Sequence, residues 1–414
     1  MSHTCMDEYD PNSLTVEQAH ELIDRIVEPV TGSERIYLRQ ALDRVLATDI
    51  PAPFDVPPHR NSAMDGYAVR ASDLPQDGST TLEVIGESFA GHPYAGTVGA
   101  RECVRIMTGA VVPEGADTVI MQERVTREGD AITIDSGHSA GDNVRHPGED
   151  VEAGDAVLRT GRRLNAADIG LLASFGIAEI DVVRRPVVAF FSTGDELKGV
   201  GIPLAEGDIY DSNRYTIHAL LERLPVEIRD MGVIPDEPEA VKNAFLQASR
   251  HADVVITSGG VSVGDADYVK QTLDALGKVD FWKIAMKPGR PLAFGRLGDA
   301  VFFGLPGNPV SVMATFILFA RPALLKRAGA AASTPLTLTA TTVKRLRKRP
   351  GRQDYQRGIL SQGKSGLVVD SAGLQSSHVL SGMSRANCFI VIPRESGDVE
   401  AGTAVEVIPF TGLF

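Results

Sequence analysis

The strongest constraint on the fold of this chain is a glycine-rich loop, which lies between a run of apolar residues and a segment predicted as a helix. The run Asp253-Val254-Val255-Ile256 is short and β-branched, which is typical of a buried strand in a parallel sheet. The loop TSGGVSVGDAD follows at 257–267, and Tyr268–Leu276 is predicted as a helix. Glycines allow positive φ and close approach of a ligand, and a helix N-terminus attracts anions. The loop therefore predicts an anion cradle, with an ordinary strand-to-helix turn as the alternative.

Basic residues and a second glycine loop follow this first loop. Lys283, Lys287 and Arg290 lie in the segment WKIAMKPGRP, and GLPGNP (304–309) leads into a helix predicted from Val310 to Arg327. Because parallel strands end at the same edge of a sheet, where ligands usually bind, we expect these groups to converge there. The pattern predicts a phosphate or oxyanion site. Solvated surface lysines are the alternative, although the apolar residues between them make full solvation less natural.

The length of 414 residues suggests two to four domains. Alternating strands and helices predict a three-layer α/β domain with a parallel sheet at 186–329. Short strands predict an inserted β domain at 53–147 and a C-terminal β barrel at 334–414. Apolar stripes at helical spacing predict a discontinuous, elongated helical linking domain at 14–52 and 148–185. In that domain a capping box begins at Thr15, a second helix covers 38–46, and Asn165 caps a third.

Composition and charge exclude several classes of protein. The chain is 43% hydrophobic, 23% charged and has a formal net charge of −13, which argues against nucleic acid as a partner. The acidic N-terminus lacks the pattern of a signal peptide, and no 18-residue apolar run predicts a membrane span. Cys5, Cys103 and Cys388 are isolated, which fits a reducing cytoplasm. Since the overall charge repels anions, local cations and amides must attract an anionic ligand.

Motifs along nearly the whole chain resemble one family. TSGGVSVGDADY, KIAMKPGRP and GLPGNPVS are similar to the molybdopterin-binding domain of the molybdopterin molybdenumtransferases, the MoeA family, whose eukaryotic relatives include the gephyrin and Cnx1 E domains. Further motifs of the same family follow in order: NSAMDGYAV (61–69), RIMTGA (105–110), GED (148–150), STGDEL (192–197), QRG (356–358) and SSH (376–378).

The resemblance implies a reaction and its reactants. In this family, adenylylated molybdopterin and molybdate give molybdenum cofactor and AMP, with Mg²⁺ assisting, and the proteins are homodimers. It also implies contacts with the molybdopterin adenylyltransferase and with apo-molybdoenzymes that receive the product. Two anionic reactants must be held together against their repulsion, which lysines and backbone amides can do. Nothing in the sequence resembles a nucleophilic triad or a HExxH metal motif.

The resemblance also implies the site residues. The expected catalytic residues are Asp65, Glu196, Asp267, Lys283 and Lys287. Glu196 and Asp267 are also the expected metal ligands, with Asp195 and Asp265 as further oxygen donors, since Mg²⁺ takes one or two carboxylates plus phosphate and water. The expected substrate-binding residues are Thr108, Asp150, Ser258, Gly259, Gly260, Ser262, Gly264, Arg290, Pro306, Pro309, Arg357 and Ser377. Because Asp65, Thr108, Asp150, Arg357 and Ser377 belong to other domains than the lysines, we expect a second protomer to complete the cleft.

Several residues keep a second interpretation. Asp65 and Thr108 each precede a glycine and fit ordinary turns. Asp236 aligns with a position of interest in the family, yet fits the N-cap of a helix predicted at 238–251. The basic run Lys344, Arg345, Arg347, Lys348, Arg349 and Arg352 fits either an anion site or a strand edge protected by charge.

Two other functions remain open at this stage. The molybdopterin adenylyltransferase shares the α/β domain, but its loop resembles TGGTG rather than SGGVSVGD, and it lacks these companion domains. A non-catalytic molybdopterin-binding scaffold, in the manner of gephyrin, is the alternative from another class. The chain lacks the appended domain expected of a scaffold, and it retains the lysines and carboxylates.

Overall fold

The computed structural model describes residues 12–259, 267–332 and 334–413, with the backbone alone at 267–271. The chain divides into two compact units. Unit 1 holds residues 1–48, 160–169 and 178–414, and unit 2 holds residues 49–159 and 170–177.

An α/β domain forms the centre of unit 1. Its strands are β13 (Val187–Thr193), β16 (Glu227–Ile234), β17 (Val254–Ser258), β18 (Gly277–Lys283), β20 (Pro291–Leu297) and β21 (Ala300–Leu305). Its helices are α3 (Ser212–Leu221), α4 (Pro238–His251), α5 (Asp267–Leu276), α6 (Pro309–Thr315) and α7 (Arg321–Arg327), the last two joined by a π-helical segment, Phe316–Ala320. Two short strands, β14 (Leu197–Lys198) and β15 (Ile209–Tyr210), pair beside the sheet.

The sheet of this domain is mixed, so the expectation of a parallel sheet is wrong in part. Its strand order is β16-β13-β17-β21-β20-β18. The first four strands are parallel, whereas β20 is antiparallel to both β21 and β18. The sequence analysis missed β20 and β21, which form a hairpin around Gly298 (φ +59°). Since two reversals cancel, β18 runs in the same direction as the parallel strands and ends at the same edge.

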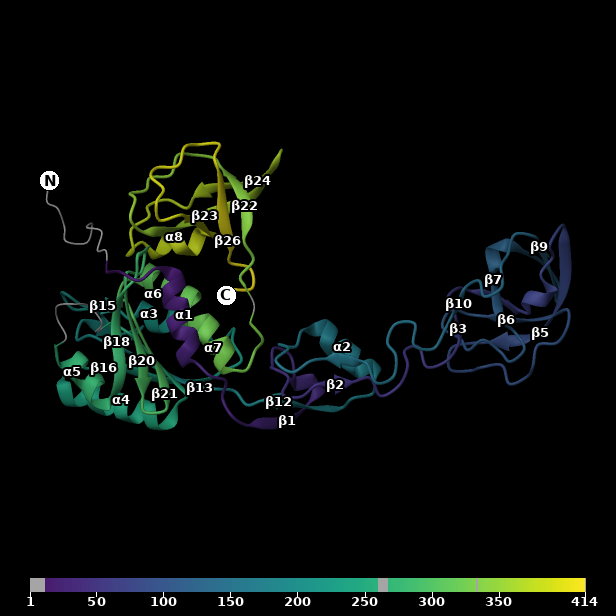
Figure 1. Cartoon of the computed structure of the whole chain (residues 1–414), viewed down its shortest axis with the longest axis horizontal. Helices are drawn as coiled ribbons and strands as arrows, with labels where there is room; N and C mark the ends of the chain where they lie inside the picture. Colours follow the sequence, from purple (N-terminus) through teal and green to yellow (C-terminus); the bar gives the residue numbers. More distant parts are fainter. Residues whose placement is uncertain (1–11, 260–266, 333, 414) are drawn as a thin grey trace. The chain divides into compact units, whose positions relative to one another are not determined.

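Helices cover both faces of the sheet, which confirms the three-layer α/β fold (Figure 1). Along β13, Val188 and Phe190 pack toward α3 and α6, whereas Ala189 and Phe191 pack toward α4 and α5. Both sets are buried because successive side chains of a strand point to opposite faces.

A closed five-stranded barrel forms the C-terminal part of unit 1, as expected. Its strands are β22 (Leu338–Thr342), β23 (Gln353–Gly363), β24 (Gly366–Ser371), β25 (Cys388–Ile392) and β26 (Ala404–Pro409), and the pairing of β23 with β25 closes it. Cys388 and Ile390 point into the barrel, whereas Phe389 and Val391 join the core cluster of the α/β domain. The helix α8 (Leu380–Arg385) contacts α6, and the two-residue strand β19 (Met286–Lys287) pairs with β23.

The linking segments of unit 1 are less helical than the sequence predicts. The helix α1 (Val16–Ile26) begins with the predicted capping box of Thr15 and Gln18. The segment 38–46, predicted as a helix, instead contains a short 3-10 turn (Leu38–Gln40), and Val45 and Leu46 form β-bridges with Arg163 and Val182. The bridges help to bury Val45 and Leu46, whereas Leu42 is exposed, so helical spacing misled the prediction. The strands β1 (Ser33–Tyr37) and β12 (Glu179–Val183) pair, and Asn165 caps α2 (Ala166–Ser174) as predicted.

Unit 2 is built on a six-stranded sheet of order β7-β4-β6-β5-β9-β8. Its strands are β4 (Gly66–Val69), β5 (Ser79–Ser88), β6 (Glu102–Ile106), β7 (Thr118–Met121), β8 (Val125–Glu128) and β9 (Ala131–Asp135). The short strands of this unit are β2 (Ile50–Pro51), β3 (Asn61–Ser62), β10 (Val144–Arg145) and β11 (Ala156–Leu158). Gly66 is required where it stands, because a Cβ there would lie 2.0 Å from the carbonyl oxygen of Ile120.

The helical stretch from Pro309 to Arg327 is long and apolar enough to cross a membrane, whereas the sequence analysis expected no such segment. However, 67% of its most apolar window is buried inside the protein. It packs against α3, α1 and β21, so it is a core helix of the α/β domain.

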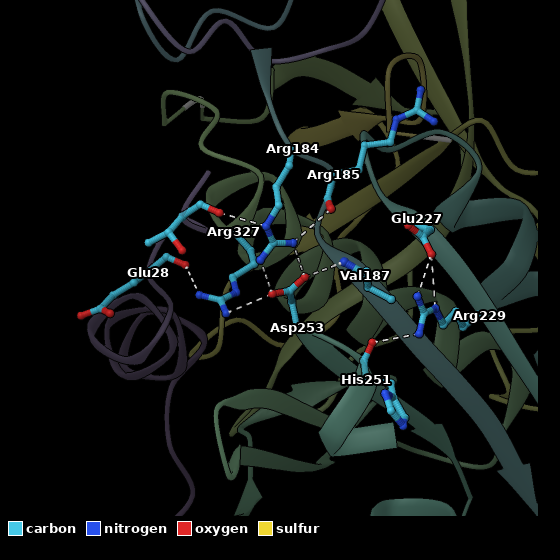
Figure 2. Close-up of polar contacts among 10 residues, drawn as sticks. Glu28, Arg184, Arg185, Val187, Glu227, Arg229, His251, Asp253 and Arg327 are labelled. Atoms are coloured by element: carbon cyan, nitrogen blue, oxygen red, sulfur yellow. Dashed lines mark hydrogen bonds and ion pairs between the residues drawn. The ribbon is translucent and has the colours of Figure 1, made fainter. Parts of the chain in front are cut away.

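A cluster of charged residues holds the edge of the sheet where the parallel strands begin (Figure 2). Asp253, just before β17, accepts hydrogen bonds from Arg184 Nη1 and Nη2 at 2.7 and 2.8 Å and from the amide of Val187 at 2.8 Å. Arg327 lies 3.6 Å from the same carboxylate and donates to the carbonyl of Glu28. We call Arg184, Asp253 and Arg327 the clasp. It joins the start of β13, the start of β17, the end of α7 and the chain after α1.

Candidate active site

The carboxyl ends of the parallel strands form the edge at which the sequence predicted a ligand. Ser192, Ser258 and Leu305 lie side by side on β13, β17 and β21. Lys283 ends β18 opposite Pro291, at the same edge. The loops that follow β13, β17 and β21 therefore start together, as doubly wound sheets require.

Gly259 adopts the predicted left-handed conformation, with φ +91°. A Cβ at this position would lie 3.0 Å from the carbonyl oxygen of Thr193, so the two loops approach each other too closely for a side chain. Gly260, Ser262 and Gly264, together with Asp265, lie outside the described residues. Asp267 begins α5, and its side chain is not among those described.

Asn213 connects two of the loops and was missed by sequence reasoning. Its Nδ2 donates to Ser258 Oγ at 2.9 Å and to the carbonyl of Gly307 at 2.6 Å. Its Oδ1 is buried without a hydrogen-bond partner, and so is Oγ1 of Thr193. Buried polar atoms are nearly always paired, so these two oxygens indicate a place for a ligand's donors. The sequence signal nearest to Asn213 is Asp211, a typical helix-capping residue. Asp211 caps α3 and accepts a hydrogen bond from Ser192 Oγ.

The second glycine loop meets the barrel at the start of α6. Pro309 occupies the first turn of α6, and Asn308 makes no side-chain cap bond. The amide of Val310 donates to the carbonyl of Ser377 at 3.0 Å, so the SSH segment of the barrel covers this helix start. Pro306 is buried beside it.

Arg357, on β23, is the largest fully buried side chain. Its Nη2 donates to the carbonyls of Leu374 and Ser376, whereas Nε and Nη1 have no hydrogen-bond partner. Burial lowers the pKa of Arg357, and no acidic side chain acts against this shift. A guanidinium stays protonated in proteins, so this buried charge has no counterion within the part of the chain that the structure describes.

The basic residues take different places. Lys283 and Lys287 are exposed and Arg290 is half-buried, while the carbonyl of Arg290 accepts from the amide of Ile284 at 2.7 Å. Lys287 lies opposite Asp354 of β23 and lines a cavity of about 720 Å³. The remaining lining residues belong to the barrel: Arg347, Lys348, Arg349, Pro350, Gly351, Arg352, Asp354 and Asp398. Gly259, Lys283 and Arg290 do not line it, so of these four residues Lys287 alone takes part in the cavity.

The predicted metal ligands are only partly described. Glu196 is exposed and folds back over Gly194, where a Cβ would lie 2.6 Å from its Oε2. Asp195 accepts a hydrogen bond from the amide of Asp236 at 3.1 Å. Glu237, not Asp236, is the N-cap of α4, which corrects the prediction. In the described part of the chain no three His, Cys, Asp or Glu residues gather as a metal site.

Asp65 and Thr108 meet in unit 2. Asp65 Oδ1 accepts from the amide and from Oγ1 of Thr108, both at 2.7 Å. The backbone hydrogen bond and the side-chain hydrogen bond from Thr108 lower the pKa of Asp65. Asp150 is exposed, and its amide donates to the carbonyl of Val56 at 2.9 Å. The structure thus joins two of the three site residues predicted in this unit.

Comparison with known proteins covers most of the chain. Residues 14–176 match the MoeA N-terminal region (domain I and II), residues 189–326 a probable molybdopterin binding domain, and residues 339–410 the MoeA C-terminal region (domain IV). Similar curated proteins include two named molybdopterin molybdenumtransferase. The protein from Haemophilus influenzae is 47% identical over 97% of this chain and 99% of its own, and that from Nostoc is 37% identical over 91% and 88%.

A solved structure agrees with these matches. The molybdopterin biosynthesis moeA protein from Pyrococcus horikoshii superposes with a TM-score of 0.85 at 30% identity, over 96% of this chain and 100% of that one. The fold and the site thus define a multidomain protein with a probable molybdopterin-binding α/β domain and a C-terminal barrel. The chain belongs to the MoeA family.

Proposed function

We propose that this protein is a molybdopterin molybdenumtransferase, which inserts molybdenum from molybdate into adenylylated molybdopterin and releases AMP. The observation that carries the proposal is the buried guanidinium of Arg357, which among the described residues has two unpaired donor groups and no counterion. Molybdate is a dianion and fits this charge. The curated names of the relatives support the same reaction.

The chain's own residues act on two anions. Arg357 and the covering SSH segment hold molybdate beside the start of α6, where the helix dipole also favours negative charge. Asn213 and Thr193 orient the pterin through their unpaired oxygens, since a pterin carries N–H donors. Lys283 and Lys287 stabilise the charge that develops on the phosphate of AMP as it leaves. Asp65 keeps its proposed catalytic role, and Thr108 and Asp150 keep their proposed roles in binding the substrate.

We include Mg²⁺ as the cofactor, held by Glu196 and Asp267. Magnesium needs only one or two protein carboxylates when substrate phosphates supply further oxygens. Glu196 is exposed at the ligand edge and fits this requirement, although the described residues form no complete cage. When bound, the ion neutralises phosphate charge.

We also propose a cytoplasmic homodimer that contacts the molybdopterin adenylyltransferase and apo-molybdoenzymes. Six exposed apolar side chains support an interface: Val200, Ile202, Leu204, Ile209, Tyr210 and Tyr215. Clusters of exposed apolar side chains mark interaction surfaces. The buried thiols Cys103 and Cys388 support a reducing compartment.

Release of AMP from adenylylated molybdopterin, dependent on added molybdate, tests the function. We expect turnover by the purified protein and its loss in Lys283→Ala. Lys278→Ala is the matched control, because Lys278 is an exposed lysine near the other end of the same strand. An inert wild type that binds the pterin tightly would favour a scaffold, and formation of adenylylated molybdopterin from ATP would favour the adenylyltransferase.

A further inference from the structure

The cavity that Lys287 shares with the barrel is strongly basic. Five cationic side chains line it, Lys287, Arg347, Lys348, Arg349 and Arg352, against the two carboxylates Asp354 and Asp398. The whole chain carries a formal net charge of −13, so this cavity locally reverses the sign of the molecule's charge. Clefts lined by one sign of charge concentrate ligands of the opposite sign.

The two carboxylates of the cavity are occupied by neighbours. Asp398 accepts from Arg345 Nη2 and from the amide of Lys348, both at 2.7 Å. Arg345 does not line the cavity, so it offsets the charge of Asp398 from outside. Asp354 is buried and accepts from Gln356 Nε2 at 3.2 Å.

Lys348 plays a structural part in the wall. It is only 6% exposed, and its Nζ lies within hydrogen-bond distance of three carbonyls, those of Arg349, Arg394 and Ser396. These bonds fix the loop on which Arg347, Arg349 and Arg352 stand. The cavity is therefore lined by arginines on a braced loop, facing a lysine from the α/β domain.

Size and chemistry indicate the ligand. A cavity of about 720 Å³ is much larger than a single tetrahedral oxyanion and lies within the range of pockets for small organic ligands. Arginine forks match phosphate oxygens in pairs. No aromatic residue is among the lining residues, so the charged groups of the cavity favour the phosphates of a nucleotide over its base.

We propose that this cavity binds the diphosphate group of a nucleotide-type ligand, with Lys287 connecting it to the ligand edge of the sheet. The identity of that ligand as adenylylated molybdopterin rests on the proposed function. The binding of a diphosphate does not.

Calorimetric titration of the full chain with inorganic pyrophosphate tests the proposal. We expect binding that weakens with ionic strength and becomes about tenfold weaker or more in Arg347→Ala/Arg352→Ala. Lys344→Ala/Lys364→Ala is the control, because it also removes two exposed charges from the barrel but neither residue lines the cavity. It should change affinity by less than about twofold. If the double variant fails to fold, Arg347→Glu replaces it as a single change at an exposed position, and it should also weaken binding about tenfold or more.

Three results would overturn the proposal: no binding by the wild type, equal weakening in the control, or molybdate binding here in preference to pyrophosphate. A protein that binds pyrophosphate in this way but releases no AMP would refute the proposed function and leave the cavity's assignment standing. A protein that releases AMP but does not bind pyrophosphate would refute the cavity's assignment and leave the proposed function standing.

Discussion

The two edges of the α/β sheet satisfy their polar groups in opposite ways. At the edge where β13 and β17 begin, the clasp of Figure 2 pairs Asp253 with two arginines and a backbone amide. At the edge where they end, Thr193 and Asn213 keep buried oxygens without partners, and the nearby barrel buries Arg357, whose Nε and Nη1 have no partner. Nε of Arg327 in the clasp also lacks a hydrogen-bond partner, but the charge of Arg327 is balanced by Asp253, whereas no acidic side chain of the described residues balances Arg357. A buried charge that has its counterion holds a structure, whereas a buried charge without one indicates an anionic ligand.

Ionisable groups at both places have shifted pKa values, so a shift alone does not locate the site. Burial alone would raise the pKa of Asp253, but hydrogen bonds from Arg184 and Val187 and the charges of Arg184 and Arg327 hold it below its ordinary value. The contacts within the clasp therefore account for the lowered pKa of Asp253 without any role in binding a ligand. The contrast between the edges therefore predicts that substitutions at the ligand edge change activity, whereas substitutions in the clasp change stability.

The largest expected effect is on activity, at Arg357. Arg357→Ala should lower the turnover rate about 100- to 1,000-fold, as loss of a preorganised oxyanion donor does. Thermal stability should change little, because removal of an uncompensated buried charge offsets the lost packing. Arg385→Ala, at an exposed arginine of α8, should retain activity. An active Arg357→Ala variant that unfolds more easily would assign Arg357 to the structure instead.

Stability should respond next, at the clasp. Asp253→Asn leaves Arg184 and Arg327 without their counterion and should lower the free energy of unfolding by about 3 kcal/mol. Urea titration followed by fluorescence of Trp282, the single tryptophan, reports on this domain because Trp282 packs on Phe294. Turnover per folded molecule should stay at the wild-type value. If Asp253→Asn lost turnover while keeping the stability of the wild type, the clasp would serve activity and the proposed difference between the two edges would be wrong.

Some of this contrast was visible in the sequence and some was not. Local signals located Thr15, Asn165 and the glycine loop, because caps and turns depend on neighbouring residues. The helix expected at 38–46 failed because Val45 and Leu46 are buried by bridges to residues more than a hundred positions away. Asn213 and the clasp were missed for the same reason, since each depends on partners distant in sequence.

The family resemblance supplied what local patterns lacked. It pointed to Arg357, which lies in an ordinary strand pattern and whose burial no sequence rule predicts. It also named Asp65 and Thr108 separately as site residues, and the structure joins them by two hydrogen bonds. It did not indicate the basic cavity, because Lys287 and the run 347–352 come together only through the pairing of β19 with β23.

Acidification should distinguish the clasp from the ligand edge. The pKa of Asp253 is lower in the folded protein than the ordinary aspartate value of 3.8, so its stabilising effect is complete above that value. It disappears as the pH falls through the folded pKa. As the pH falls below 3.8 the wild type should therefore lose stability more steeply than Asp253→Asn, as measured by urea midpoints. Parallel pH profiles for the two proteins would contradict this assignment.

Asn213→Ala should have a smaller effect than Arg357→Ala, since its hydrogen bonds are between neutral groups. We expect a rate about tenfold lower, because the substitution removes the ties to Ser258 and Gly307 together with the unpaired Oδ1. Asn213→Asp separates these parts: it keeps an acceptor but loses the Nδ2 donor. Equal losses in both variants would assign the effect to the ties, whereas greater activity in Asn213→Asp would support the acceptor.

The smallest expected effect is at Asp65, where unit 2 has its own hydrogen-bonded carboxylate. Thr108→Val removes the hydroxyl bond to Asp65 Oδ1 but keeps the amide bond, which has the larger effect on its pKa. The pKa of Asp65 should therefore rise while staying below its ordinary value. If ionised Asp65 serves the reaction, the acid limb of the pH–rate profile moves to higher pH by the same small amount. Thr126→Val, at an exposed threonine of β8, is the control and should leave the profile unchanged. A carboxyl titration followed by NMR that shows the Asp65 shift without any movement of the acid limb would limit the Asp65–Thr108 pair to a structural turn.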